Sequence, residues 1–266
     1  MSKSFLFGIL LICASTLGAQ ERANVPLDDP SRPVQVRAHL MFGGISVRAA
    51  DIKQVIVEAR GRAKEDDHDN EPPPEAHGMK RIDAGGSGLD VTEENNVVTI
   101  KTGSMRPADL VITVPRRTSL QLKSMSGGDI YVEGVQGEVD ADNMNGKVTL
   151  KDVSGSVLAH SMNGEVKVSL NQVDLSKPMS FSTMNGDIDV TLPDTFKANV
   201  RMKTDNGSIY SDFDVKLDSG AHAERNEAGG TYHLRYDRSL RGTINGGGAD
   251  VQFTTYNGQI YIRRRK

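Results

Sequence analysis

The sequence is organised by a glycine that recurs every nine residues across residues 126–168. The recurring residues are Gly128, Gly137, Gly146, Gly155 and Gly164. A β-branched apolar residue stands two positions after each glycine and another apolar residue four positions after it, as Val148 and Leu150 do after Gly146. Apolar residues at alternate positions behind a turn residue predict a half-buried strand. A strand in every unit limits this region to an all-β, repeating architecture.

A second, longer period overlies the first. The triplet Met144-Asn145-Gly146 returns as Met162-Asn163-Gly164 after two nine-residue units, so two strands make one structural repeat. Asn-Gly units continue less regularly at residues 184–186, 205–207 and 256–258. Coils of two strands that stack on one another explain both periods.

Stacked coils would place equivalent residues in columns. With an 18-residue coil, Asp129, Lys147 and Glu165 share one outward column of alternating charge, which favours strand pairing. Val148 and Val166 point inward in the same register, so an aspartate at either position would place an unpaired charge in the core and unfold the domain.

An antiparallel meander is the alternative, because Asn-Gly is the preferred pair in two-residue hairpin turns. Six such pairs occur, beginning at Asn145, Asn163, Asn185, Asn206, Asn245 and Asn257. The meander leaves the 18-residue recurrence of Met-Asn-Gly unexplained. We therefore predict an all-β fold, a parallel β-solenoid with strand repeats of about nine and 18 residues.

We expect one β-solenoid repeat domain over residues 34–262. Strand patterns recur at residues 43–47, 54–59, 96–100 and 109–114. Residues 61–88 interrupt them with an acidic, proline-rich stretch, which predicts an inserted mobile surface loop. With 5 % aromatic residues and no tryptophan, the core must be thin and built from aliphatic side chains.

Residues 1–19 have the pattern of a secretory signal peptide. Lys3 precedes an apolar run over residues 5–12, and Leu17-Gly18-Ala19 offers a small-residue cleavage site. The run is too short to span a bilayer, and no later segment approaches that length, so we expect no transmembrane segment in the mature chain.

Three shorter features complete the predicted organisation. Cys13 is the only cysteine and lies within the predicted signal peptide, so the mature chain would hold no disulfide. Ile12, which precedes it, does not fit a lipoprotein box. Residues 20–33 are polar and proline-punctuated, which predicts an extended leader. Residues 263–266, Arg-Arg-Arg-Lys, predict a solvated basic tail that discourages edge-to-edge stacking. The alternative for this tail is binding to anionic envelope polymers.

Three successive segments carry a family resemblance. Residues 109–115, 119–122 and 126–132, followed by repeated Asn-Gly-[Asp/Glu/Lys]-[Ile/Val] units, resemble the bacterial putative-adhesin β-strand-repeat family. This is a domain family of unknown function related to auto-transporter adhesin head domains. The resemblance covers about residues 34–262. It implies an exported parallel β-solenoid with adhesion as its role, and it implies no catalytic residues.

Candidate metal ligands do not form a recognisable set. His68 and His77 stand among carboxylates, but their spacing matches no ligand pattern. Residues 85–91 match the calcium nonapeptide of β-rolls once, whereas such a calcium ion is held between adjacent turns. The remaining histidines are scattered singly, at His39, His160, His222 and His233. We predict no metal site and no cofactor.

The sequence also lacks a recognisable set of catalytic residues. The carboxylates available for a polysaccharide-cleaving site are Asp140, Asp142, Asp152 and Asp189. Acidic residues occur throughout the chain, and nothing in the sequence distinguishes a pair of these four as catalytic. The chain has neither a Gly-x-Ser-x-Gly elbow nor a mature cysteine. We predict no catalytic and no cofactor-binding residues. A polysaccharide-active β-helix enzyme is the alternative, which a cleft lined by converging carboxylates would support.

Met144, Met162 and Met184 form a recurring series with two interpretations. Methionines can form a soft binding stripe, but we expect these three to fill irregular gaps beside the turns. A net charge of −3 and a pI of about 6.1 give no indication of nucleic-acid binding. The sequence thus predicts an exported, non-enzymatic protein of the periplasm or cell surface. Its role would be that of an adhesin or of a binding or scaffold module for an envelope polymer, surface or protein. A periplasmic structural or envelope-stress component is a further alternative.

Overall fold

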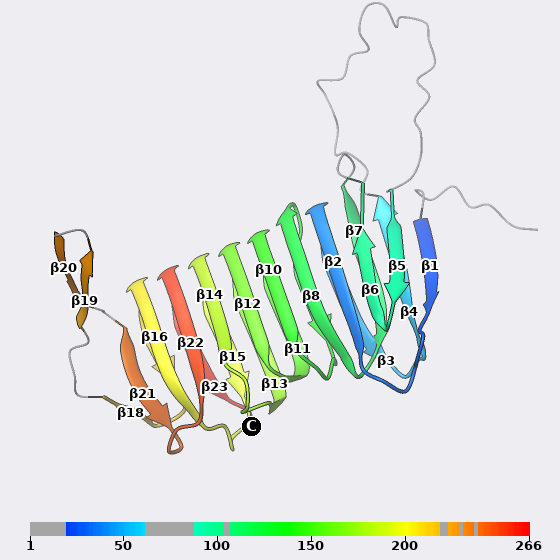
Figure 1. The fold of residues 1–266 in the computed structure, drawn as a ribbon. Coiled ribbons are helices and arrows are strands. Elements are labelled where there is room, and N and C mark those ends of the chain that lie inside the picture. The colour runs from blue at the N-terminus through cyan, green and yellow to red at the C-terminus, as the bar shows by residue number, and fades with distance from the viewer. Residues whose placement is uncertain (1–19, 62–87, 104–106, 219–222, 229–230, 237–238) are drawn as a thin grey trace, which may run out of the picture.

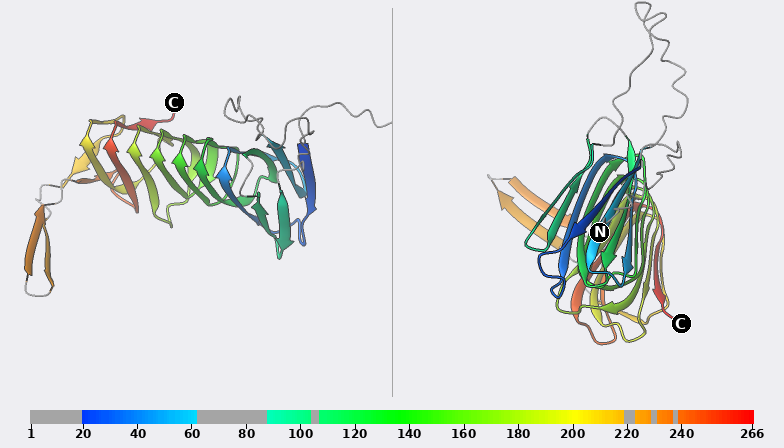
Figure 2. Two further views of the ribbon diagram at one scale, coloured as in Figure 1. Left: turned by 90° about the horizontal axis from the view of Figure 1, so that it is seen from above. Right: turned by 90° about the vertical axis from the view of Figure 1, so that its right-hand side faces the viewer.

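The computed structural model describes residues 20–61, 88–103, 107–218, 223–228, 231–236 and 239–266. The predicted signal peptide and nearly all of the predicted acidic loop lie outside the described residues. Within these ranges every regular element is a strand, and none of them holds a helix that could cross a membrane. Two long sheets face each other along one elongated stack (Figures 1 and 2).

The two large sheets are here named sheet A and sheet B, and they contain ten and eleven strands. Sheet A has the order β1 (Gln20–Pro26), β4 (Gln54–Gly61), β7 (Ala108–Pro115), β3 (Ile45–Ala50), β9 (Ile130–Glu133), β11 (Val148–Gly155), β13 (Val166–Val173), β15 (Ile188–Leu192), β23 (Ile260–Arg264) and β17 (Ile209–Ser211). Sheet B has the order β18 (Val215–Leu217), β21 (Leu240–Ile244), β16 (Ala198–Asn206), β22 (Ala249–Asn257), β14 (Met179–Asn185), β12 (Val157–Asn163), β10 (Val139–Asn145), β8 (Thr118–Ser126), β2 (Val34–Phe42), β6 (Val97–Lys101) and β5 (Asp90–Glu94). The strands β19 (Ala223–Ala228) and β20 (Thr231–Tyr236) form a separate antiparallel pair.

The central strands pair in parallel. The chain alternates between the sheets, so β10 pairs with β12 in sheet B, and β11 pairs with β13 in sheet A. Val139 lies opposite Val157 and Val148 lies opposite Val166, so both pairs keep the 18-residue offset that also separates Asn145 from Asn163. The antiparallel meander is therefore wrong for this part of the chain. Antiparallel pairing occurs towards the two ends of the stack, as between β4 and β7 or β16 and β21.

A thin aliphatic core separates the sheets. Val148 and Val166 are fully buried, which confirms the predicted inward register. Valine, isoleucine, leucine and alanine make up most of the buried set. Two aromatic rings also stack in this core, Phe181 on β14 and Phe253 on β22, whose ring centroids lie 5.2 Å apart. These rings continue one inward column, because Phe181 and Phe253 are register partners.

The order of coils in the stack differs from their order in the chain at both ends. The coil β2–β3 lies between β6–β7 and β8–β9, and the coil β22–β23 lies between β14–β15 and β16–β17. Both insertions pair in parallel along their two sides. The strands share one period-two pattern, so the residues of a single strand do not say which coil will be its neighbour.

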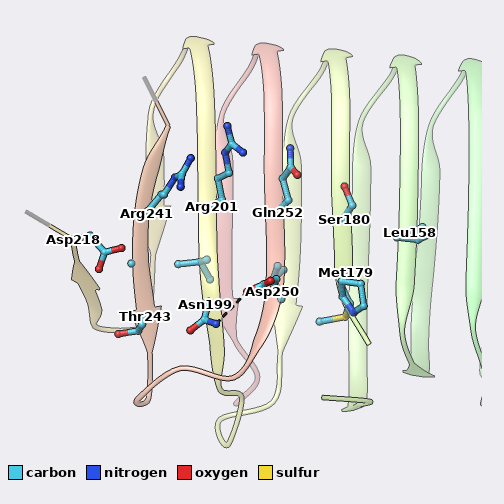
Figure 3. A pocket seen from close by; sticks show the side chains of 14 residues that line it. Leu158, Met179, Ser180, Asn199, Arg201, Asp218, Arg241, Thr243, Asp250 and Gln252 are labelled. Atoms are coloured by element: carbon cyan, nitrogen blue, oxygen red, sulfur yellow. Dashed lines mark hydrogen bonds between the residues drawn. The ribbon is translucent and has the colours of Figure 1, made fainter. Parts of the chain in front are cut away.

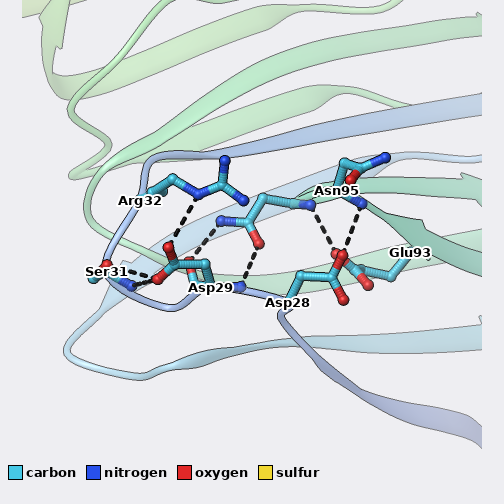
Figure 4. A network of polar contacts seen from close by, with 7 residues as sticks. Asp28, Asp29, Ser31, Arg32, Glu93 and Asn95 are labelled. Carbon is cyan, nitrogen blue, oxygen red and sulfur yellow. Dashed lines mark hydrogen bonds and ion pairs between the residues drawn. The ribbon is translucent and has the colours of Figure 1, made fainter.

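The segment predicted as an extended leader belongs to sheet A. Its first seven residues form β1, which pairs antiparallel with β4, and both Val25 and Leu27 are buried. The following turn is fixed to the β5–β6 turn (Figure 4). The Asn96 Nδ2 donates to the Asp29 carbonyl at 2.6 Å, and the Asp29 N–H donates to Asn96 Oδ1 at 2.8 Å. The apolar residues within this polar stretch explain why it packs.

The basic tail is exposed but not free. Arg263 and Arg264 end β23, whose residues 260–262 lie between β15 and β17 in sheet A, so the tail follows an interior strand. Three arginines of the tail are held to the fold by ion pairs: Arg263 to Asp189 at 2.7 Å, Arg264 to Asp194 at 2.8 Å, and Arg265 to Asp152 at 2.9 Å. The predicted protection against edge-to-edge stacking is wrong, because the last strand lies inside the stack and not at its end.

Candidate functional site

The most regular surface of the molecule is the corner at which the chain leaves sheet B for sheet A. There the sequence repeats a small polar residue, an outward residue, asparagine and glycine. Residues 161–164, 183–186 and 255–258 are three such corners. Each of these four positions requires its residue type for a different physical reason. Together they place the outward side chains of successive corners in one row in solvent.

The glycines stack directly on one another. A Cβ added to Gly164 would lie 2.2 Å from the carbonyl oxygen of Gly146, and one added to Gly186 would lie 2.3 Å from that of Gly164. No side chain fits at such distances from backbone, so only glycine lets adjacent corners approach at strand spacing. This close approach accounts for the recurrence of glycine in the sequence.

Buried hydroxyls satisfy the stacked glycine carbonyls. Ser161, Thr183 and Thr255 are no more than 4 % exposed. Their hydroxyls donate to the carbonyls of Gly146 at 2.9 Å, Gly164 at 2.8 Å and Gly186 at 3.0 Å, in that order. A buried hydroxyl needs a partner, and each of these has one in the neighbouring coil. Sequence reasoning missed this column. Its signal in the sequence is a serine or threonine three residues before the glycine of the same corner, as Ser161 stands before Gly164.

The corner asparagines form a ladder. We use "asparagine ladder" for Asn145, Asn163, Asn185, Asn257 and Asn206, in stacking order. Each side-chain amide donates to the Oδ1 of the preceding member, at distances of 2.8 to 3.0 Å. A continuous row of amide hydrogen bonds fixes the edge of the corner, as in stacked β-structures.

Between the ladder and the buried hydroxyls lies a row of exposed apolar side chains, the "apolar stripe". Its members are Met41, Met125, Met144, Met162, Met184 and Tyr256. They occupy matching outward positions on six consecutive strands of sheet B and are 39 to 50 % exposed. The prediction that the methionines fill gaps beside the turns is wrong. At strand spacing the stripe is about 24 Å long.

Polar side chains border the stripe on both sides. The predicted charge column is confirmed: Lys147 Nζ lies 3.4 Å from Glu165 Oε2, and Asp129 Oδ1 accepts a hydrogen bond from the Lys147 N–H at 2.8 Å. On the other side, His160 Nδ1 is 2.8 Å from Ser182 Oγ. An apolar row with a polar rim is typical of an interaction site.

The four carboxylates considered for catalysis are not brought together. Asp140 and Asp142 lie on β10 in sheet B, whereas Asp152 and Asp189 lie on β11 and β15 in sheet A. Asp152 and Asp189 are ion-paired with arginines of the last strand and the residue after it. Asp142 lies 4.0 Å from the Lys123 ammonium.

The candidate metal ligands are only partly placed. Among the described residues, no group of three histidine, cysteine, aspartate or glutamate side chains could hold a metal ion. His39 and His160 are exposed on separate strands of sheet B. The side chains of His68, His77, His222 and His233, and residues 85–87 of the nonapeptide match, lie outside the described part.

A groove of about 480 Å³ lies on the outer face of sheet B, near the inserted coil (Figure 3). Arg241, Arg201, Gln252 and Ser180 occupy matched outward positions on four adjacent strands along it. Sequence reasoning missed this groove because its residues come from four separated segments. The insertion of β22 between β14 and β16 is what brings them side by side.

Comparisons with known proteins concern the family and the fold. A family model described as Toastrack DUF4097 matches residues 90–262. A solved structure of a putative cell adhesion protein from Clostridium sporogenes ATCC 15579 aligns with a TM-score of 0.42 and 9 % identity, covering 93 % of this chain and 99 % of that one. A putative adhesin from Bacteroides fragilis NCTC 9343 aligns with a TM-score of 0.38 and 11 % identity, covering 93 % and 97 %. Among curated proteins, none matches the chain.

Proposed function

The chain belongs to the Toastrack DUF4097 family, and from that premise and the geometry of the corner we propose that it is a non-enzymatic binding module of the cell envelope. Its contact surface is the outer face of sheet B along the apolar stripe. The module acts as an adhesin or scaffold through many weak contacts along a strand face. Its partner is an envelope polymer, surface or protein.

The proposal includes the organisation of the whole chain. Residues 1–19 act as a signal peptide, and the mature protein works in the periplasm or at the cell surface. Residues 34–262 form one β-solenoid domain with 18-residue coils at its centre. The register between β10 and β12 and between β11 and β13 supports that period.

The observation that carries the proposal is the ordered exposure of the stripe. The stacked corners hold six apolar side chains in one row in solvent, and the asparagine ladder runs beside four of them, Met144, Met162, Met184 and Tyr256. Methionine is flexible and polarisable, so a row of it adapts to irregular partner surfaces. An exposed apolar row lowers solubility unless a partner covers it, which favours a binding role.

The test replaces three methionines and measures binding to isolated cell envelopes of the source organism. The triple variant Met144→Gln, Met162→Gln, Met184→Gln keeps side-chain length and removes the apolar surface. Binding should weaken by at least about tenfold, since each buried methionine contributes on the order of 1 kcal/mol or more. Circular dichroism should remain that of the wild type, because these side chains lie outside the core.

The matched control is Thr149→Ala, Lys167→Ala, Thr191→Ala. These residues lie on β11, β13 and β15, the sheet A half of the same region. The control should bind like the wild type. Equal binding by the methionine variant and the wild type would refute the proposed contact surface.

Protease treatment of intact cells distinguishes the two locations. An antibody against residues 61–88 reports whether that segment survives. Its loss from whole cells indicates the cell surface and an adhesin. Its protection until the envelope is opened indicates a periplasmic scaffold.

A further inference from the structure

The apolar stripe is also a row of thioethers. Five of its six members are methionines, and they lie on five adjacent strands of sheet B (Figure 1). The register sets them side by side, as it does for Met144 and Met162, which precede two paired asparagines. Adjacent strands are about 4.8 Å apart, so the five side chains span about 19 Å. In stacking order they are Met41, Met125, Met144, Met162 and Met184.

All five of these side chains are open to solvent. They are 39 to 49 % exposed, whereas Met179 and Met202 in the core are 2 % exposed. Met179 and Met184 lie on the same strand, β14, which therefore carries one buried and one exposed methionine. Methionine is oxidised at its sulfur. A small oxidant can thus react with the stripe without opening the fold.

An exposed apolar row does not require methionine. Leu158, an outward residue of β12, is 39 % exposed, so the same face of sheet B also accepts leucine. Methionine adds a thioether that can be oxidised and reduced again. Cysteine is the other oxidisable sulfur residue, and the only one, Cys13, belongs to the proposed signal peptide. Among the described residues, the stripe therefore gathers the exposed sulfur on one surface.

We propose that the apolar stripe is a reversible oxidation site, at which hydrogen peroxide converts the methionines to sulfoxides and thereby releases the bound partner. This inference rests on the proposed function, since it assigns regulation to the proposed contact surface. The sulfur lone pair attacks one peroxide oxygen, the O–O bond breaks, and the peroxide is reduced by two electrons and leaves as water. In the reverse step a dithiol reductase supplies two electrons, becomes a disulfide, and returns methionine and water.

The sulfoxide oxygen changes what the stripe can bind. Each oxidised side chain places a polar S=O group where an apolar one stood. A partner that covers the stripe must remove water from that oxygen, which is unfavourable unless the partner offers it a hydrogen-bond donor. The five side chains lie outside the core, so the change affects binding and not the fold.

The test treats the purified full-length protein with graded concentrations of hydrogen peroxide. Peptide mass spectrometry follows the gain of one oxygen at each methionine, and the same samples are assayed for binding to isolated envelopes. The stripe methionines should be oxidised before Met179 and Met202. Binding should then weaken by at least about tenfold, as in the glutamine triple variant, while circular dichroism stays unchanged. Methionine sulfoxide reductases specific for the two epimers should restore binding.

A leucine variant separates the stripe from the other methionines. It should bind like the wild type and keep its binding after peroxide treatment, because it retains the apolar row without the sulfur. Met79 and Met105, outside the described residues, remain in it, so a loss caused by them would persist. The matched control, Met179→Leu with Met202→Leu, should stay as sensitive to peroxide as the wild type. The leucine variant combines Met41→Leu, Met125→Leu, Met144→Leu, Met162→Leu and Met184→Leu.

Two results would overturn the inference: full oxidation of the stripe with unchanged binding, or equal losses of binding in the leucine variant and the wild type. If the leucine variant does not fold, the reductase step decides, and a loss of binding that the reductases do not reverse would overturn the inference as well.

The glutamine triple variant tests the proposed function separately. Weaker binding of that variant, together with unchanged binding of the oxidised wild type, would refute the oxidation site alone and leave the contact surface standing. Unchanged binding of the glutamine variant would refute the contact surface itself, whatever the order in which the methionines are oxidised.

Discussion

Gly164 shows how one residue sets the spacing of the corner. Its missing side chain leaves room for the Gly146 carbonyl, and that carbonyl in turn accepts the Ser161 hydroxyl. Steric fit and hydrogen bonding are thus coupled at the same atom. A larger residue would separate two corners and lengthen the bond that satisfies a buried polar group.

Gly164→Ala should lower the free energy of unfolding by about 1–3 kcal/mol, the range for overpacking a tight site. The added Cβ would lie 2.2 Å from a backbone oxygen that no side-chain movement can relieve. Gly61→Ala is the control, because an added Cβ there meets no atom within 4 Å. Urea unfolding compares the two variants. Equal stability of Gly164→Ala and the wild type would contradict the stacked-glycine account.

At the scale of the strand, columns of charge join neighbouring coils on sheet A. Glu133 on β9 accepts a hydrogen bond from Lys151 Nζ on β11 at 2.7 Å and one from the Tyr131 hydroxyl at 3.0 Å. The hydrogen bond from Lys151 is the largest cause of the lowered pKa of Glu133, and that from Tyr131 adds to it. The carboxylate is therefore held in its charged form on the strand surface.

A lowered folded-state pKa means that Glu133 contributes stability above its unfolded pKa, near 4.5, and that this contribution is lost as the pH falls through the folded pKa. Glu133→Gln should therefore flatten the dependence of the melting temperature on pH below about 4.5. Lys151→Met should flatten it less, because the Tyr131 hydroxyl still donates to the carboxylate, and adding Lys151→Met to Glu133→Gln should change nothing further. Additive effects would show that the two groups act separately.

The sequence predicts the strands and their inward faces well, because period-two alternation is a local property. Val148, Val166 and the charged column of Asp129, Lys147 and Glu165 lie where the 18-residue offset puts them. The exposure of the methionines was not predicted, because an apolar residue beside a turn can either pack into a gap in the fold or lie exposed in a row on its surface. The groove was not predictable either, because it depends on which coils become neighbours.

The insertion of β22–β23 is a property of the whole molecule. This coil pairs with β14–β15 on one side and with β16–β17 on the other. Ending the chain at Gly248 therefore removes an interior coil and exposes two buried faces, so we expect loss of cooperative unfolding and of most strand signal in circular dichroism. A stable, cooperatively folded product would mean that β16–β17 can dock directly on β14–β15.

The matched control for this truncation deletes a segment of comparable length that does not belong to either large sheet. Replacing residues 219–238 by Gly-Gly deletes β19 and β20, which pair with neither large sheet. The ends can be joined, because β18 and β21 are antiparallel neighbours and the Asp218 N–H already donates to the Arg241 carbonyl at 2.9 Å. This variant should retain its melting temperature within a few degrees, since β19 and β20 form no ladder with either large sheet.

The same inserted coil determines how the molecule would respond to mechanical load. A pull on the chain at Arg264 reaches β23, which pairs with β15 along its length and with β17 over residues 260–262, and which the Arg263–Asp189 and Arg264–Asp194 ion pairs anchor. Tension along that strand must shear two ladders together, whereas an edge strand can be peeled away from a single neighbour. A module held at this point would resist detachment under flow without a disulfide among its described residues.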